Sequence, residues 1–69
     1  MSNLIYTKHS DHFEIRFRSL FKEGRALAFP CDADGHVDLD ALPVGGRRNY
    51  LMATALVGRE YALPVVLAA

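Results

Sequence analysis

The chain contains one cysteine, Cys31, among its 69 residues. A single cysteine excludes a disulfide within the chain, and without a secretory signal it is typical of a reduced cytoplasmic thiol. The segment 1–8 has neither the basic start nor the long apolar stretch of a signal peptide, so we expect no export by that route. The expected location is therefore the cytoplasm.

Neither sign of charge is in excess, because eight Lys and Arg residues balance eight Asp and Glu residues. No overall field then favours nucleic acid or an anionic membrane, and binding to either would require a local patch. Long apolar stretches are also missing. The longest, 51–58 and 61–69, fall well short of the roughly 18 to 20 residues that cross a bilayer, so we expect no membrane partner.

What is present is a large apolar fraction in a short chain, since 51% of the residues are hydrophobic. A domain of this size buries only about 60% of its extended surface on folding, which leaves its stability marginal. No disulfide can supplement that stability. We therefore expect a single domain, 1–69, that gains further stabilisation from oligomerisation or from a metal.

Alternation of apolar and polar residues predicts strands in the first half of the chain. The alternation is strict in 13–18, where the aromatic and aliphatic residues fall on one face. We predict strands at about 4–8, 13–20 and 25–29 in an antiparallel meander, with a short extended piece near 36–38. Pro30 should end the third strand or confine it to a sheet edge. The predicted inner face consists of Phe13, Ile15, Phe17, Leu27 and Phe29.

Helix-forming residues dominate the second half, and we predict one main helix over 47–61. The preceding Val44-Gly45-Gly46 is expected to be a flexible joint. Pro64 cannot continue a helix, so 62–69 should be an extended apolar tail. The side of the helix that faces the sheet would carry Tyr50, Ala53, Thr54, Val57 and Tyr61. The predicted fold class is α+β, a small antiparallel sheet of three to four strands packed against one main C-terminal helix.

A second apolar surface predicts self-association. Met52 and Leu56 lie nearly opposite the sheet-facing side of the predicted helix. Together with the tail they would form a contiguous patch of the kind that monomers seldom expose, and pairing about a twofold axis would cover it in both copies. We therefore predict a homodimer. Its interaction residues would be Met52, Leu56, Val65, Val66 and Leu67.

The stretch 32–40 holds most of the candidate site chemistry. Asp32, Asp34 and Asp38, with a glycine between them, overlay part of a calcium loop, which makes these aspartates candidate metal ligands. The overlay fails at both ends, where a proline and an alanine occupy ligand positions. The alternative is a tight turn whose aspartates cap the backbone.

Zinc and thiol chemistry are disfavoured by the spacing of the ligands. Cys31 and the histidines His9, His12 and His36 include no Cys-x-x-Cys pair, which argues against a zinc site within one chain. As a nucleophile, Cys31 would need activation by His36 across a turn, so a small buried thiol is the simpler interpretation. We predict no catalytic residue and no cofactor.

An interface for nucleic acid is the alternative that five arginines offer. They are Arg16, Arg18, Arg25, Arg47 and Arg48. Gathered on one face, they would form a modest platform for a phosphate backbone. Glu14 lies in the same row as two of them, so ion pairs on a solvated sheet face are the competing interpretation. The Gly45-Gly46-Arg47-Arg48 segment would suit a phosphate at a helix N-terminus, but with no strand directly before it we interpret it as a hinge.

Several segments resemble a group of short, uncharacterised bacterial proteins of about this length, chiefly from proteobacteria. The likeness runs from 19 to about 65, and Phe29-Pro30-Cys31-Asp32 and Val57-Gly58-Arg59-Glu60 are its most specific parts. It also includes Val-Asp-Leu-Asp-Ala-Leu at 37–42. The resemblance implies no activity. We interpret the chain as a structural or protein-interaction module, homo-oligomeric and non-catalytic, with nucleic-acid association and metal binding as the alternatives.

Overall fold

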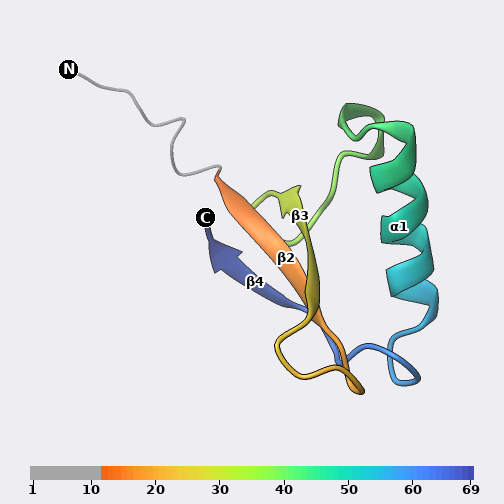
Figure 1. Ribbon diagram of the computed structural model, residues 1–69. Helices are drawn as coiled ribbons and strands as arrows, with labels where there is room; N and C mark the ends of the chain where they lie inside the picture. Colours follow the sequence, from red (N-terminus) through yellow and green to blue (C-terminus); the bar gives the residue numbers. More distant parts are fainter. Residues whose placement is uncertain (1–11) are drawn as a thin grey trace.

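The computed structural model describes residues 12–69, and the strand predicted at 4–8 lies outside them. The described elements are β2 (Phe13–Arg18), β3 (Ala26–Cys31), the short 3-10 helix η2 (Leu39–Ala41), α1 (Val44–Ala55) and β4 (Val65–Ala68). The strands form one antiparallel sheet, and α1 packs on one face of it (Figure 1). The predicted α+β class is confirmed.

The sheet has the order β3-β2-β4, so β2 is its central strand. Phe13 of β2 faces Cys31 on one side and Ala68 on the other, and both pairings are antiparallel. This order corrects the predicted meander, because the third strand comes from the tail at 62–69. β3 and β4 therefore occupy both edges of β2. The predicted meander had placed the strand at 4–8 along one of these edges.

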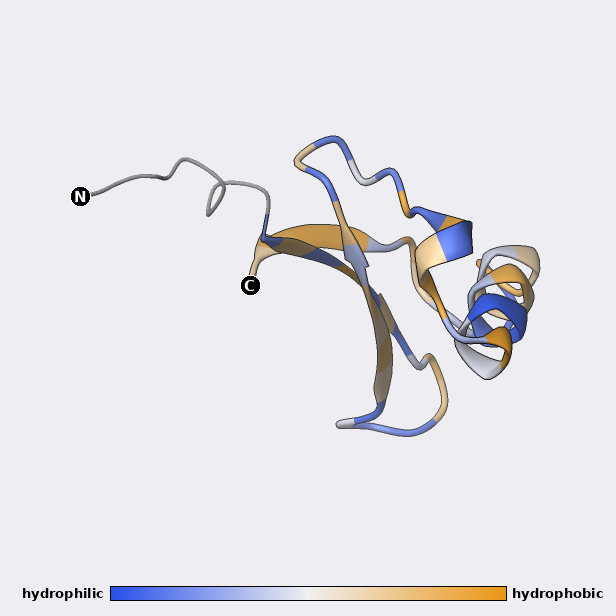
Figure 2. Ribbon diagram, turned by 90° about the horizontal axis from the view of Figure 1, so that it is seen from above, coloured by the Kyte–Doolittle hydropathy of each residue, from blue (hydrophilic) through white to orange (hydrophobic). Residues whose placement is uncertain are grey.

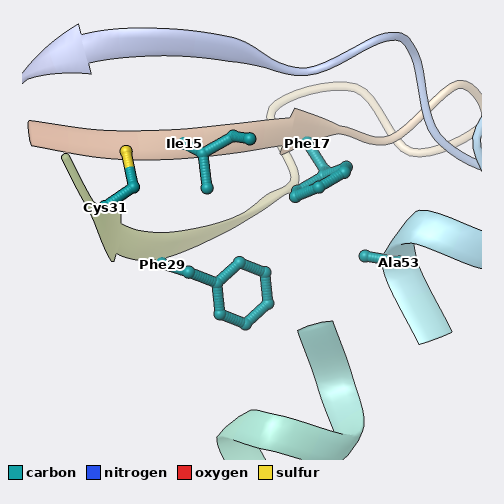
Figure 3. Packing of buried hydrophobic residues seen from close by; sticks show 5 residues of the cluster. All are labelled: Ile15, Phe17, Phe29, Cys31 and Ala53. Atoms are coloured by element: carbon teal, nitrogen blue, oxygen red, sulfur yellow. The ribbon is translucent and has the colours of Figure 1, made fainter. Parts of the chain in front are cut away.

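The core lies between the sheet and α1 (Figure 3). Side chains alternate along each strand, so one face of β2 and β3 is apolar and turns toward the helix. The predicted inner face is confirmed, because each of its members is buried or packs against the buried cluster. The buried residues are Ile15, Phe17, Phe29, Cys31 and Ala53.

Three aromatic rings join the sheet to the helix. The ring of Tyr50 on α1 packs edge to face on Phe17 and on Phe29, at centroid distances of 6.1 and 5.3 Å. Edge-to-face pairs of this kind contribute about 0.5–1.5 kcal/mol beyond the area that they bury. One turn further along the helix, Ala53 is completely buried, and its small side chain lets α1 lie close to the sheet.

The helix begins earlier than predicted, at Val44 rather than 47. The segment Val44-Gly45-Gly46, expected to be a flexible joint, is its first turn. Pro43 precedes it in an extended conformation, and the Pro43 carbonyl accepts the Arg47 N–H at 2.9 Å. The N–H groups of a first turn need no partner inside the helix, so residues with low helix propensity are tolerated there.

The helix also ends earlier than predicted, at Ala55 rather than 61. Leu56 is its C-cap, and the Leu56 carbonyl accepts three N–H groups of the following turn at 2.9–3.2 Å. Gly58 in that turn has a φ of +87°, a left-handed conformation typical of the residues that terminate helices. Val57 and Tyr61 still pack against the core from this turn, which explains why they fit the helical pattern. Within 12–69, no helix has the length and apolar character needed to cross a membrane.

One proline lies within an outer strand of the sheet and another lies directly before one. Pro30 lies within β3 opposite Glu14, so it does not end the strand. Because β3 is an edge strand, the other prediction, that Pro30 confines the strand to a sheet edge, is confirmed. Pro64 lies directly before β4. Between β4 and the bridge that joins Ser19 to Tyr61, the register against β2 shifts by one residue, and Pro64 falls in this irregular stretch.

Candidate functional site

The loop after β3 is organised by the side chain of Asp32. Its Oδ1 accepts the backbone N–H groups of Asp34 and His36 at 2.9 and 2.8 Å. The backbone closes the same turn, because Gly35 donates to the Asp32 carbonyl at 3.0 Å and Asp32 donates to the His36 carbonyl at 3.1 Å. The turn expected here is thus a loop capped by one aspartate, which we call the Asp32 loop (32–36).

Within residues 12–69, one group of metal-ligating side chains converges. An atom from each of Asp32, Asp34 and His36 lies within 4.8 Å of the others, and all three residues are exposed. Asp38, the third candidate ligand from the sequence, instead caps η2, where its Oδ1 accepts the Asp40 N–H at 3.1 Å. Hydrogen bonds to the backbone account for the position of Asp32 without an ion.

We expect Asp32→Asn to lower the stability of the fold modestly and to weaken its dependence on acid. The His36 N–H, with a smaller contribution from the Asp34 N–H, lowers the pKa of the Asp32 carboxyl. A carboxyl with a lowered pKa stabilises the fold above its unfolded pKa of about 3.9 and loses that effect as the pH falls through the folded value. Urea unfolding from about pH 6 to pH 2 should show that acid lowers the free energy of unfolding more in the wild type than in Asp32→Asn.

The same two proteins test the metal alternative. Because the backbone already engages the Asp32 carboxylate, added calcium should leave the melting temperature of both proteins unchanged. A rise in the wild type that is lost in Asp32→Asn would assign this loop to metal binding.

Cys31 is a buried thiol in the core face of β3 (Figure 3). Burial raises the pKa of the Cys31 thiol, and the negative charges of Asp32 and Glu14 raise it further. A raised pKa reduces the fraction of thiolate, which is the form that attacks substrates or binds metals. The surroundings of Cys31 therefore favour a structural thiol over a nucleophile.

The five candidate arginines divide among three places. Arg16 and Arg18 lie on β2, Arg25 in the connection from β2 to β3, and Arg47 and Arg48 on α1. Arg16 pairs with Glu14 on the outer sheet face, with its Nε donating to Glu14 Oε2 at 3.1 Å. The structure thus places the two helix arginines on a different element from the three of the sheet region, and an acidic partner neutralises one of those three.

The five candidate interaction residues fall into two groups. Met52 is exposed on α1, whereas Leu56 is half-buried at the C-cap of that helix. Val65, Val66 and Leu67 belong to β4, at the edge of the sheet that lies away from α1 (Figures 1 and 2). The helix and the tail therefore contribute two separate surfaces in place of the contiguous patch that was expected.

β4 is exposed along its whole length. The exposed fractions are 53% for Val65 and 38% for both Val66 and Leu67. In the register with β2, Val65 lies beside Arg16 and Leu67 beside Glu14, on the sheet face opposite α1. We use the term β4 surface for Leu63, Val65 and Leu67 on this outer face together with the free edge of β4. Among the described elements, none covers it (Figure 2).

The β4 surface borders a small groove of about 230 Å³. The groove is lined by Arg16, Arg18, Ala62, Leu63, Val65 and Leu67. Its walls combine apolar side chains with two long basic ones, and Leu63 is among the most exposed apolar residues of the described chain. This arrangement suits a contact with another polypeptide better than the enclosure of a small molecule.

No known protein family, curated protein or solved structure matches the chain. The function is therefore inferred from the β4 surface and the Asp32 loop themselves. The sequence indicates the apolar tail at 62–69 but not the strand β4 within it. The available signal was the β-branched pair Val65-Val66, whose partner strand lies near the other end of the chain.

Proposed function

We propose that the chain is a small, non-catalytic protein-interaction module that works as a homodimer in the bacterial cytoplasm. The exposure of β4 carries this proposal, because three large apolar side chains lie on an edge strand that no described element covers. Exposed, uncharged edge strands are templates for association with another chain. The single free thiol suits a reducing compartment.

The titratable groups support binding over catalysis. Active sites bring together groups whose pKa values are shifted toward a chemical task and place them in a cleft. In the described part of the chain, the thiol of Cys31 and the carboxyl of Asp32 have shifted pKa values. The first is buried in the core and the second caps an exposed turn, so each shift has a structural cause.

We expect the wild type to sediment as a monomer–dimer equilibrium. A contact built on a four-residue strand buries less than the roughly 1,200 Å² of a standard interface, so a dissociation constant of about 10–100 µM is expected. Leu67→Lys should weaken association at least about tenfold, because it replaces an apolar side chain of the contact by a charged one in both copies. Sedimentation at several concentrations measures both proteins.

Met52→Lys is the matched control for this experiment. Met52 is exposed to a similar degree, but it lies on α1 and outside the β4 surface, so the substitution should leave the dissociation constant unchanged. Dissociation by Met52→Lys alone would move the contact to the helix. A wild type that remains a folded monomer at every concentration would contradict the homodimer itself.

A further inference from the structure

We propose that the two copies join edge to edge through the backbone of β4, so that their sheets form one continuous six-stranded sheet. This inference rests on the homodimer proposed above and specifies how it is built. Three features support it. Some backbone groups of β4 point outward, the two edges of the sheet differ, and one register pairs all the outward groups.

The hydrogen-bond alternation identifies the free backbone groups of β4. The Ala69 N–H donates to the His12 carbonyl at 2.9 Å, in the same register as the ladder between β2 and β4. In an antiparallel pair, every second residue directs its N–H and C=O toward the neighbouring strand. Leu67 therefore bonds toward β2, whereas Val66 and Ala68 direct their N–H and C=O groups toward the open edge.

The opposite edge of the sheet is protected at one position by a proline. On β3, the Ser19 N–H donates to the Arg25 carbonyl at 2.9 Å, which fixes the alternation and turns the nitrogen of Pro30 away from β2. Proline has no N–H to donate, and prolines on edge strands are a common protection against pairing. β4 has neither a proline nor a charged residue. Of the two edges of the described sheet, that of β4 is the more open to pairing, because all of its outward residues retain their N–H groups.

One register pairs all the outward groups of both copies. When Leu67 lies opposite Leu67 of the partner subunit, Val66 lies opposite Ala68 of the partner subunit, and each such pair exchanges two N–H···O bonds. Apolar side chains then meet on both sheet faces, because the nearest charged residues are on β2. A twofold pairing uses the same edge in both copies, so assembly stops at the dimer.

Cysteine cross-linking tests this register. Leu67→Cys, made with Cys31→Ala, would bring two thiols into a non-hydrogen-bonded pair with Cα atoms about 4.5 Å apart, where a disulfide can form. Val65→Cys is the matched control on the same outer face, and its two copies would lie about 13 Å apart along the strands. We expect a covalent dimer from Leu67→Cys alone. Cross-linking of Val65→Cys but not Leu67→Cys would overturn the register.

Amide hydrogen exchange separates edge pairing from other kinds of dimer. In the concentrated wild type, the Val66 and Ala68 amides should be protected and should lose that protection on dilution. The Leu67 amide, which bonds to β2, should stay protected at every concentration and serves as the internal control.

Two outcomes would overturn the proposal in distinguishable ways. A dimer whose Val66 and Ala68 amides exchange freely would exclude edge pairing while leaving the homodimer intact. A monomer in which both amides stay protected would show that another segment of the same chain covers the edge, and it would remove the homodimer as well.

Discussion

Phe17→Ala is expected to leave the protein largely unfolded at room temperature. Phe17 is the largest fully buried side chain of the described residues, with 1% of its surface exposed. Removing a buried phenylalanine ring costs about 3–5 kcal/mol, because the transfer energy is lost and a cavity remains. A domain of this length has a total stability of only about 3–10 kcal/mol.

The position of Phe17 in the sheet makes compensation difficult. Its ring packs edge to face on Phe29 at 6.0 Å and on Tyr50 at 6.1 Å, so it links β2 and β3 to α1. Urea unfolding followed by circular dichroism measures the loss. Phe21→Ala is the control, since Phe21 is 74% exposed and its removal should change stability by less than about 0.5 kcal/mol. A Phe17→Ala variant as stable as this control would place the core elsewhere.

The sheet-facing residues could be predicted from the sequence because local periodicity determines them. The strict alternation in β2 fixed which side chains point inward, and the resumed alternation in β3 did the same for Leu27 and Phe29. On the helix, the spacing identified Tyr50 and Ala53 as core residues correctly. It was wrong for Thr54, which is exposed and whose hydroxyl donates to the Leu51 carbonyl at 2.9 Å. These features depend on neighbours a few residues apart, which a sequence displays directly.

The helix boundaries and β4 could not be predicted from local patterns. Helix propensity disfavours Gly45 and Gly46, but a first turn tolerates them, whereas Gly58 stops the helix through its left-handed backbone. β4 is only four residues long, and its partner is the first described strand of the chain. Pairing over that distance has no local signature, so the tail could be predicted only as an extended apolar segment that docks on its own domain or on a neighbour.

The candidate metal residues show the same division. The sequence placed Asp32 and Asp34 together, because both belong to one tight turn. The acidic residues before Ala41 also indicated the N-cap of a short helical turn, which Asp38 supplies for η2. The sequence did not show that the Asp32 carboxylate would accept the N–H of His36. That contact depends on the path of the turn between the two residues, in which Gly35 has a left-handed φ of +87°.

Gly35 also connects the Asp32 loop to β4. A Cβ at this position would lie 3.1 Å from Cγ2 of Val66 and 3.9 Å from Cδ1 of Ile15. The loop therefore lies directly on the inner face of β4 at the residue whose backbone points to the open edge. Any substitution that adds a side chain at Gly35 should therefore lower the stability of the fold and displace the edge strand β4.

Gly35→Ala is expected to be more destabilising than Gly58→Ala. Both glycines have a φ of +87°, so each alanine would adopt a left-handed conformation at a cost of about 1–2 kcal/mol. Nothing lies within 4 Å of a Cβ at Gly58, whereas a Cβ at Gly35 meets Val66, and overpacking adds about 1–3 kcal/mol. Urea unfolding of the two variants measures the difference.

The double variant Gly35→Ala with Val66→Ala identifies the source of that difference. Val66→Ala removes the Cγ2 atom that the new Cβ would meet, so the two substitutions together should be less destabilising than the sum of their separate effects by about 1 kcal/mol. If the two changes in unfolding free energy are additive, the Asp32 loop shifts to accommodate the new Cβ without a steric clash with Val66. If Gly35→Ala and Gly58→Ala destabilise equally, backbone strain accounts for both, and the loop does not hold the edge strand in place.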